Sequence, residues 1–161
     1  MFATAPIRLE QNPIDILETL FSSQSVGFER RGTNEVVAEL PGKWDNLLLF
    51  FAWEENLKCL HLSCFINIEK ICCDRGRIFE LLALINENLW LGHFSYWAEH
   101  KMPIFKHSVI IDDLSDFEQN LNQVISISIT ECERMYPVFQ AVMVQNMSPE
   151  KVLFATSGVL Q

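Results

Sequence analysis

Basic residues are scarce in this chain of 161 residues, which holds 12 Lys and Arg against 21 Asp and Glu and carries a formal net charge of −9. Proteins that bind nucleic acid or anionic membranes need clustered Lys and Arg to replace counterions. The charge therefore argues against nucleic acid and against membrane as partners. Neutral or basic protein partners are the better expectation.

Long hydrophobic runs are also missing. The longest one, LLLFFAW, is far shorter than the ~20 apolar residues that a membrane-spanning helix needs. The opening MFATAPIRLE lacks the basic start and the apolar stretch of roughly 7–15 residues that mark a secretory signal. We expect a cytoplasmic protein.

The cysteines lack any CxxC spacing. Their odd count of five, without an export signal, argues against a disulfide framework and favours free thiols in a reducing cytoplasm. Cys72 and Cys73 are adjacent, which suits neither a zinc knuckle nor an ordinary disulfide, so their role stays open. We expect neither a metal nor any other cofactor.

What is present is an ordinary globular composition, 49% hydrophobic and 20% charged, which excludes a disordered chain. A chain of this length forms about one domain with a real core. We expect a single domain over residues 1–161. It has a short N-terminal extension over 1–11 and a short C-terminal helix near 148–157.

Helix signals begin with NPIDILETLFSSQ, where Asn12 can cap and Pro13 suits the first helical position, so a helix is expected over about 13–23. A second helix is expected in CDRGRIFELLALINENLWLG. Asp74 is its capping residue, and Gly92 stands where a left-handed residue ends a helix.

A third helix is expected to open with Ser115 and Glu118, which have the spacing of a capping box. Pro137 interrupts its pattern, so the following residues either continue the helix with a kink or start a new segment. Ser148, with Pro149 after it, is expected to cap a short last helix.

Strand signals lie between these helices. Turn motifs RGTN, PGKWDN and EENL divide residues 26–68 into three or four antiparallel strands, and HFSYWAEHKMPIFKHSVII reads as a hairpin that turns at AEHKM. The expected order is α-βββ(β)-α-ββ-α. Helices mixed with hairpins, without strict βα alternation, define an α+β fold with an antiparallel sheet packed against helices.

The hairpin LLLFFAWEENLKCLHLSC has two apolar faces. Because side chains alternate along a strand, one face is expected to hold Leu47, Leu49, Phe51, Trp53, Leu60, Leu62 and Cys64. The other is expected to hold Leu48, Phe50, Ala52, Cys59, His61, Ser63 and Phe65. A half-buried sheet normally has one polar face, so the second face is expected to be covered by another element or by a partner subunit.

Two kinds of cover remain open for that second face. Uncovered, it would expose Leu48, Phe50 and Phe65 as one patch, which a symmetric homodimer would bury. The alternative is that the kinked third helix and the last helix wrap onto it, through Val138, Phe139, Val142 and Val152.

Several stretches together resemble the YbjN-like family of bacterial proteins, whose fold is similar to that of type III secretion chaperones. They span about residues 12–150: NPIDILE, GFER, LPGKW, LLFFAWEENLKCLHLSC, ELLALINENLWLGHFSYW, MPIFKH and ECERMYPVFQ. The resemblance implies an α+β sandwich, often paired as a dimer, with a chaperone-like or regulatory role and no catalytic residues. The chain departs from the pattern at NIEKICCDRG and in its uncharged ending LFATSGVLQ.

Candidate reactive groups are few. His93, His100 and His107 share one expected hairpin, but nothing completes a set of three or four metal ligands. Cys59 and His61 share a strand face, at a spacing too wide for a nucleophile and its base. Glu87 and His93 form no convincing acid–base pair, because charged helix faces are normally just solvated.

Four tryptophans complete the candidates: Trp44, Trp53, Trp90 and Trp97. Such aromatics usually fill cores, yet they also dominate interface hot spots, and Trp90 follows the polar string NEN. We expect a non-enzymatic protein-binding module with a chaperone-like or regulatory role, and Leu48, Phe50, Phe65 and Trp90 as candidate protein contacts. The alternative is a small-molecule or metal-binding sensor domain.

Overall fold

A computed structural model describes residues 11–157 and shows one six-stranded antiparallel sheet in the order β1-β2-β3-β4-β6-β5. The strands are β1 (Gly27–Arg30), β2 (Glu35–Leu40), β3 (Leu47–Glu54), β4 (Cys59–Phe65), β5 (His93–Trp97) and β6 (Met102–Ile110). The helices are α1 (Pro13–Ser23), α2 (Arg75–Asn86), α3 (Phe117–Phe139), the π-helix η1 (Gln140–Val144) and α4 (Pro149–Thr156). The α+β class and the predicted order are confirmed. The predicted extension over 1–11 lies, apart from Gln11, outside the described residues.

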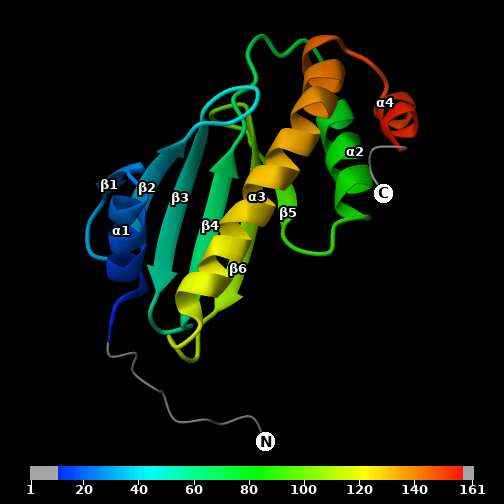
Figure 1. Cartoon of the computed structure of the whole chain (residues 1–161). Coiled ribbons are helices and arrows are strands. Elements are labelled where there is room, and N and C mark those ends of the chain that lie inside the picture. The colour runs from blue at the N-terminus through cyan, green and yellow to red at the C-terminus, as the bar shows by residue number, and fades with distance from the viewer. Residues whose placement is uncertain (1–10, 158–161) are drawn as a thin grey trace, which may run out of the picture.

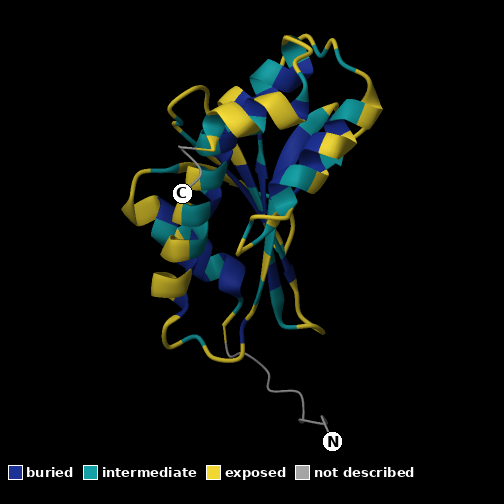
Figure 2. Ribbon diagram, turned by 90° about the vertical axis from the view of Figure 1, so that its right-hand side faces the viewer, coloured by how far each residue is buried: buried dark blue, intermediate teal, exposed yellow. Residues whose placement is uncertain are grey.

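The helices are all gathered toward one side of the sheet. Helices α1 and α3 cross in front of the strands, α2 lies beside β5, and α4 packs against α2 (Figure 1). Seen from the side, buried residues lie on the strands and on the helix surfaces that turn toward them (Figure 2). The opposite face of the sheet carries no described helix.

Helix α1 begins and ends where the sequence predicts. The side chain of Asn12 accepts a hydrogen bond from the backbone N–H of Ile14 at 2.9 Å, and Pro13 is the first helical residue. Arg30 of β1 donates to Asp15 at 2.6 Å and to Glu18 at 2.9 Å. These two ion pairs fix α1 over the β1 edge of the sheet.

Helix α2 is capped by Asp74 as predicted, but its predicted end at Gly92 is wrong. The helix ends at Asn86, whose side chain donates to the carbonyl of Phe94 at 2.9 Å and accepts from the N–H of Phe94 at 2.7 Å. Gly92 lies in the connection that follows, with a φ of +69°, where an added Cβ would collide with the ring of Phe105. The glycine therefore allows this connection to approach β6 closely and does not cap the helix.

Helix α3 differs from the prediction at its start. It begins at Phe117, and the hydroxyl of Ser115 donates to Asp113 at 2.9 Å, so the predicted capping box is wrong. Pro137 does not end the helix, which continues to Phe139 and then widens into η1. Ser148 precedes α4 as predicted, without a side-chain capping bond.

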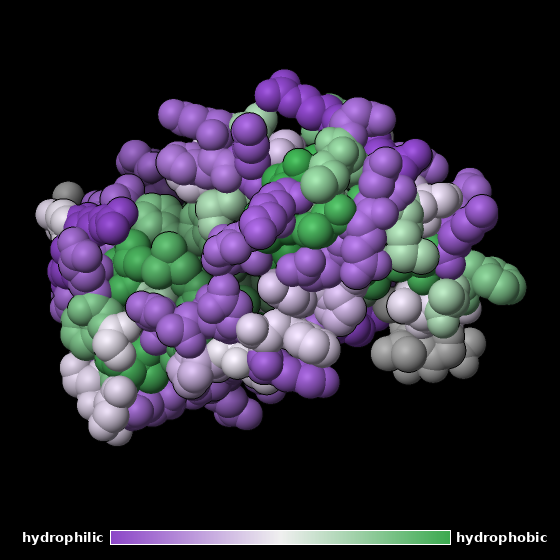
Figure 3. Space-filling model, turned by 90° about the horizontal axis from the view of Figure 1, so that it is seen from above, coloured by the Kyte–Doolittle hydropathy of each residue, from purple (hydrophilic) through white to green (hydrophobic). Residues whose placement is uncertain are grey.

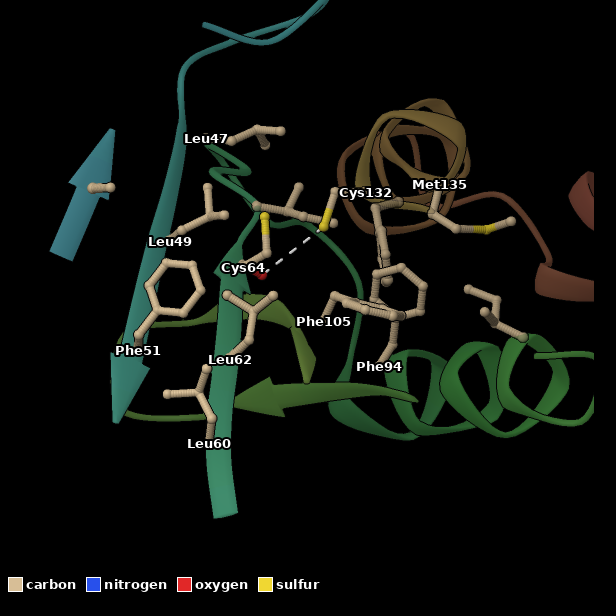
Figure 4. Packing of buried hydrophobic residues seen from close by; sticks show 14 of the residues in the cluster. Leu47, Leu49, Phe51, Leu60, Leu62, Cys64, Phe94, Phe105, Cys132 and Met135 are labelled. Atoms are coloured by element: carbon tan, nitrogen blue, oxygen red, sulfur yellow. Dashed lines mark hydrogen bonds between the residues drawn. The ribbon is translucent and has the colours of Figure 1, made fainter. Parts of the chain in front are cut away.

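The core lies between the helices and the face predicted to hold Leu49, Phe51 and Leu62, and the register pairs Leu49 with Cys64 and Phe51 with Leu62. Figure 4 shows these side chains pointing toward α3, with Cys132 directed at the carbonyl of Cys64. The residues proposed to cover the second face also belong to this core: Val138, Phe139, Val142 and Val152. The alternative in which the C-terminal helices wrap onto the second face is therefore wrong.

Candidate binding face of the sheet

The second face of the sheet is built from rows of side chains that run across the strands. Leu48 lies beside Phe65, which lies beside Ile104 of β6. In the next row Phe50 lies beside Ser63, which lies beside Lys106. We call this surface the open face.

A groove of about 650 Å³ crosses the open face. Its apolar floor contains the three predicted residues Leu48, Phe50 and Phe65, and Leu48 keeps 42% of its surface exposed. The described lining is completed by Arg31, Val37, His61, Ser63, Ser95, Tyr96, Trp97, His100, Met102, Ile104 and Lys106. A surface groove with an apolar floor that is also lined by polar side chains can hold a partner that presents both apolar and polar groups.

Sequence reasoning missed the β5 and β6 part of this groove. It did not foresee that β6 pairs with β4, which brings Ile104 and Lys106 beside Phe65 and Ser63. Trp97 packs its ring 5.7 Å from that of Phe65 and 3.9 Å from that of His100. The alternation of MPIFKHSVI predicts a strand, but it does not indicate which strand lies beside it in the sheet.

His61 is held in place on the open face by two serines. Its Nδ1 lies 2.8 Å from the hydroxyl of Ser108 and its Nε2 lies 3.1 Å from that of Ser63. Burial lowers the pKa of His61, and the positive charge of Lys106 lowers it further. Both ring nitrogens are thus engaged by serines, so His61 is not set up as a base for Cys59.

His93 and His107, which share the β5–β6 hairpin, lie on opposite faces of the sheet. His93 pairs with Lys106 in the register, so His93 lies on the open face, and His107, the next residue along β6, lies on the opposite face. Among the described residues, no group of three or more His, Cys, Asp or Glu side chains is placed to hold a metal ion.

The tryptophans are mostly outside the core, contrary to the expectation. Only Trp53 is buried. Trp44 stacks on Tyr136 with centroids 5.8 Å apart and donates to the carbonyl of Glu133 at 3.1 Å, which ties the connection between β2 and β3 to α3. The indole of Trp44 makes both contacts from the surface of the molecule.

Trp90 is almost fully exposed, at 99%, in the connection between α2 and β5. It is not among the residues that line the groove, so the structure brings together three of the four candidate contacts and leaves Trp90 apart. On the end of the molecule seen from above, hydrophobic side chains form separate patches divided by hydrophilic ones (Figure 3). The open face differs because its apolar residues are contiguous across four strands.

Fold and groove together define an α+β protein whose single sheet has one face covered by helices and a second, largely apolar face that no described helix covers. The chain belongs to the YbjN family: the family model described as "Putative bacterial sensory transduction regulator" matches residues 13–141. A comparison with the curated proteins gives no match. Within residues 11–157, every helix is too short or too polar to cross a membrane.

Proposed function

We propose that this protein is a non-enzymatic, cytoplasmic regulatory module that binds protein through the open face, in the manner of a chaperone that holds a partner segment. The observation that carries the proposal is the contiguous apolar groove of about 650 Å³ on a face that no described element covers. Membership of a family described as sensory transduction regulators supports a regulatory role.

The composition of the groove favours protein as the occupant. Its lining contains Trp97, Met102 and Arg31 together with Phe50 and Phe65. Aromatic residues, Met and Arg are enriched at protein interfaces, where they act as anchors. Nucleic acid and anionic membranes are disfavoured by the net charge of −9.

Site-specific photo-crosslinking tests the proposal. A photoreactive phenylalanine analogue is placed at Phe50 in the groove or, as the matched control, at Phe154, an exposed phenylalanine of α4. After irradiation in bacterial cells we expect adducts with proteins other than this chain from position 50, and few from position 154. Equal adducts from both positions, or none from position 50, would remove the support for the open face.

A small-molecule sensor is the second candidate, because the volume of the groove lies within the roughly 300–1,000 Å³ typical of ligand sites. A thermal-shift screen of bacterial metabolites against the purified protein tests this second candidate. A metabolite that raises the melting temperature of the protein, but not that of a Phe50→Asp variant, would favour the sensor. If a small molecule is the occupant, photo-crosslinking from position 50 should give no protein adducts.

A further inference from the structure

The open face has its charges sorted across the sheet. Its β1–β2 side carries Glu29, Glu35 and Glu39, with Arg31 in a loose 3.8 Å pair with Glu29. Its β6–β5 side carries Lys106 and His93, which lie beside each other in the register. The apolar residues of β3 and β4 lie between the two sides.

We propose that a second copy of this chain covers the open face, related to the first by a two-fold axis that runs parallel to the strands between β3 and β4. This inference deepens the proposed function and rests on it, because it names a second copy of the chain as a protein that binds the same surface. The sheet order places three strands on each side of that axis, so the rotation exchanges β3 with β4, β2 with β6 and β1 with β5.

The shapes in the centre fit this arrangement. The rotation brings Phe50 over Ser63 of the partner subunit, which sets a large side chain against a small one. It brings Leu48 over Phe65 of the partner subunit. Two sheets stacked in this way align their strands within about 30°, as in sandwiches.

The charges fit only this direction of the axis. Lys106 comes over Val37 of the partner subunit, which lies between two glutamates on the open side of β2, namely Glu35 and Glu39. An axis perpendicular to the strands would instead set glutamate against glutamate and Lys106 against its own copy. Glu54 lies at the end of β3, beyond the apolar centre.

The surface is large enough for a stable dimer. Six strands spaced ~4.8 Å apart, from the 4 residues of β1 to the 9 residues of β6 in length, span a footprint on the order of 600 Å². Standard interfaces bury about 800 Å² on each partner, and side-chain relief adds to a flat footprint. Isologous pairing is also the commonest form of soluble assembly.

Sedimentation equilibrium of the full chain tests the proposal by charge exchange. We expect twice the 18.6 kDa mass of the chain for the unchanged protein at micromolar concentration. Lys106→Glu, and separately Glu35→Lys with Glu39→Lys, should each weaken the dimer at least about tenfold, because both place like charges together. Mixing the two variants should restore a dimer that contains one copy of each.

Lys151→Glu on α4 is the control, because it makes the same charge change at an exposed site away from the face and should leave the dimer intact. Circular dichroism confirms that each variant is folded. A dimer that is insensitive to Lys106→Glu, or variants that do not recombine, would overturn the pairing. A monomer at every concentration would also overturn it, yet protein adducts from position 50 would then still support the proposed function.

Discussion

Phe50 and Phe51 follow each other in β3, yet their side chains lie on opposite faces of the sheet. Phe51 is fully buried, with its ring 5.7 Å from that of Phe21 in α1. Phe50 is only half-buried and lines the groove of the open face. One strand therefore supplies both the core and the candidate binding surface.

Substitution of Gly92 tests the close approach between the α2–β5 connection and β6. Gly92→Ala should lower the free energy of unfolding by ~2 kcal/mol or more. Its φ is positive, and the new Cβ would stand 2.7 Å from the carbonyl oxygen of Lys106, besides colliding with Phe105. Gly27→Ala is the control, since a Cβ there meets nothing within 4 Å. Urea denaturation measures both, and equal effects would contradict the steric explanation.

Truncation of the α2 core stripe tests the packing of that helix. Ile85, only 4% exposed, and Leu82 face the core, so Ile85→Ala or Leu82→Ala should cost ~2–5 kcal/mol in unfolding free energy. Trp90→Ala, at the exposed site, should change stability by less than ~0.5 kcal/mol. A loss below that value for Ile85→Ala would place its side chain at the surface.

The folded protein should lose stability in mild acid because of His61. Its folded-state pKa is lowered, chiefly by burial, so the unfolded chain binds a proton more readily than the folded chain as the pH falls below about 6.5. Stability should therefore decrease from about pH 7.5 to pH 5.5, and His61→Gln should reduce that decrease. His107, whose pKa is also lowered by burial, adds to the effect in the same direction. An unchanged pH dependence in His61→Gln would refute the assignment.

Thiol labelling should separate the cysteines by burial. Cys72 is exposed, whereas Cys64 and Cys132 are buried, and the pKa of Cys132 is raised by its hydrogen bond with Cys64 and by burial. Because the thiolate is the reactive form, iodoacetamide should modify Cys72 first and leave the buried pair intact in the folded protein. Mass spectrometry of the digested peptides measures the order in which the cysteines are modified. Labelling of Cys132 at the rate of Cys72 would contradict this core packing.

The sequence sufficed where local rules decide. Alternation predicted the two faces of the β3–β4 hairpin, including Leu48, Phe50 and Phe65, and Asn12 and Asp74 marked helix starts through their capping side chains. These features depend on neighbours within one hairpin or one turn. They need no knowledge of the tertiary fold.

The sequence failed where distant segments decide. The pairing of β6 with β4 brings Lys106 to the open face, and no local pattern encodes it. The end of α2 is set by hydrogen bonds between Asn86 and Phe94, which override the glycine signal at Gly92. Trp44 is at the surface because Tyr136 and Glu133 of α3 hold it there.

The unfolding free energies of Phe50→Ser and Phe51→Ser, compared at submicromolar concentration, test most directly whether the open face is a surface and not a second core. Phe51→Ser should cost at least about 3 kcal/mol, because it leaves a cavity in the core. Phe50→Ser should cost no more than about 1 kcal/mol, the span of strand propensity, because the side chain is only half-buried and no described helix covers its face of the sheet. Equal large losses in the monomeric protein would show that the open face is covered within one chain and would contradict the account.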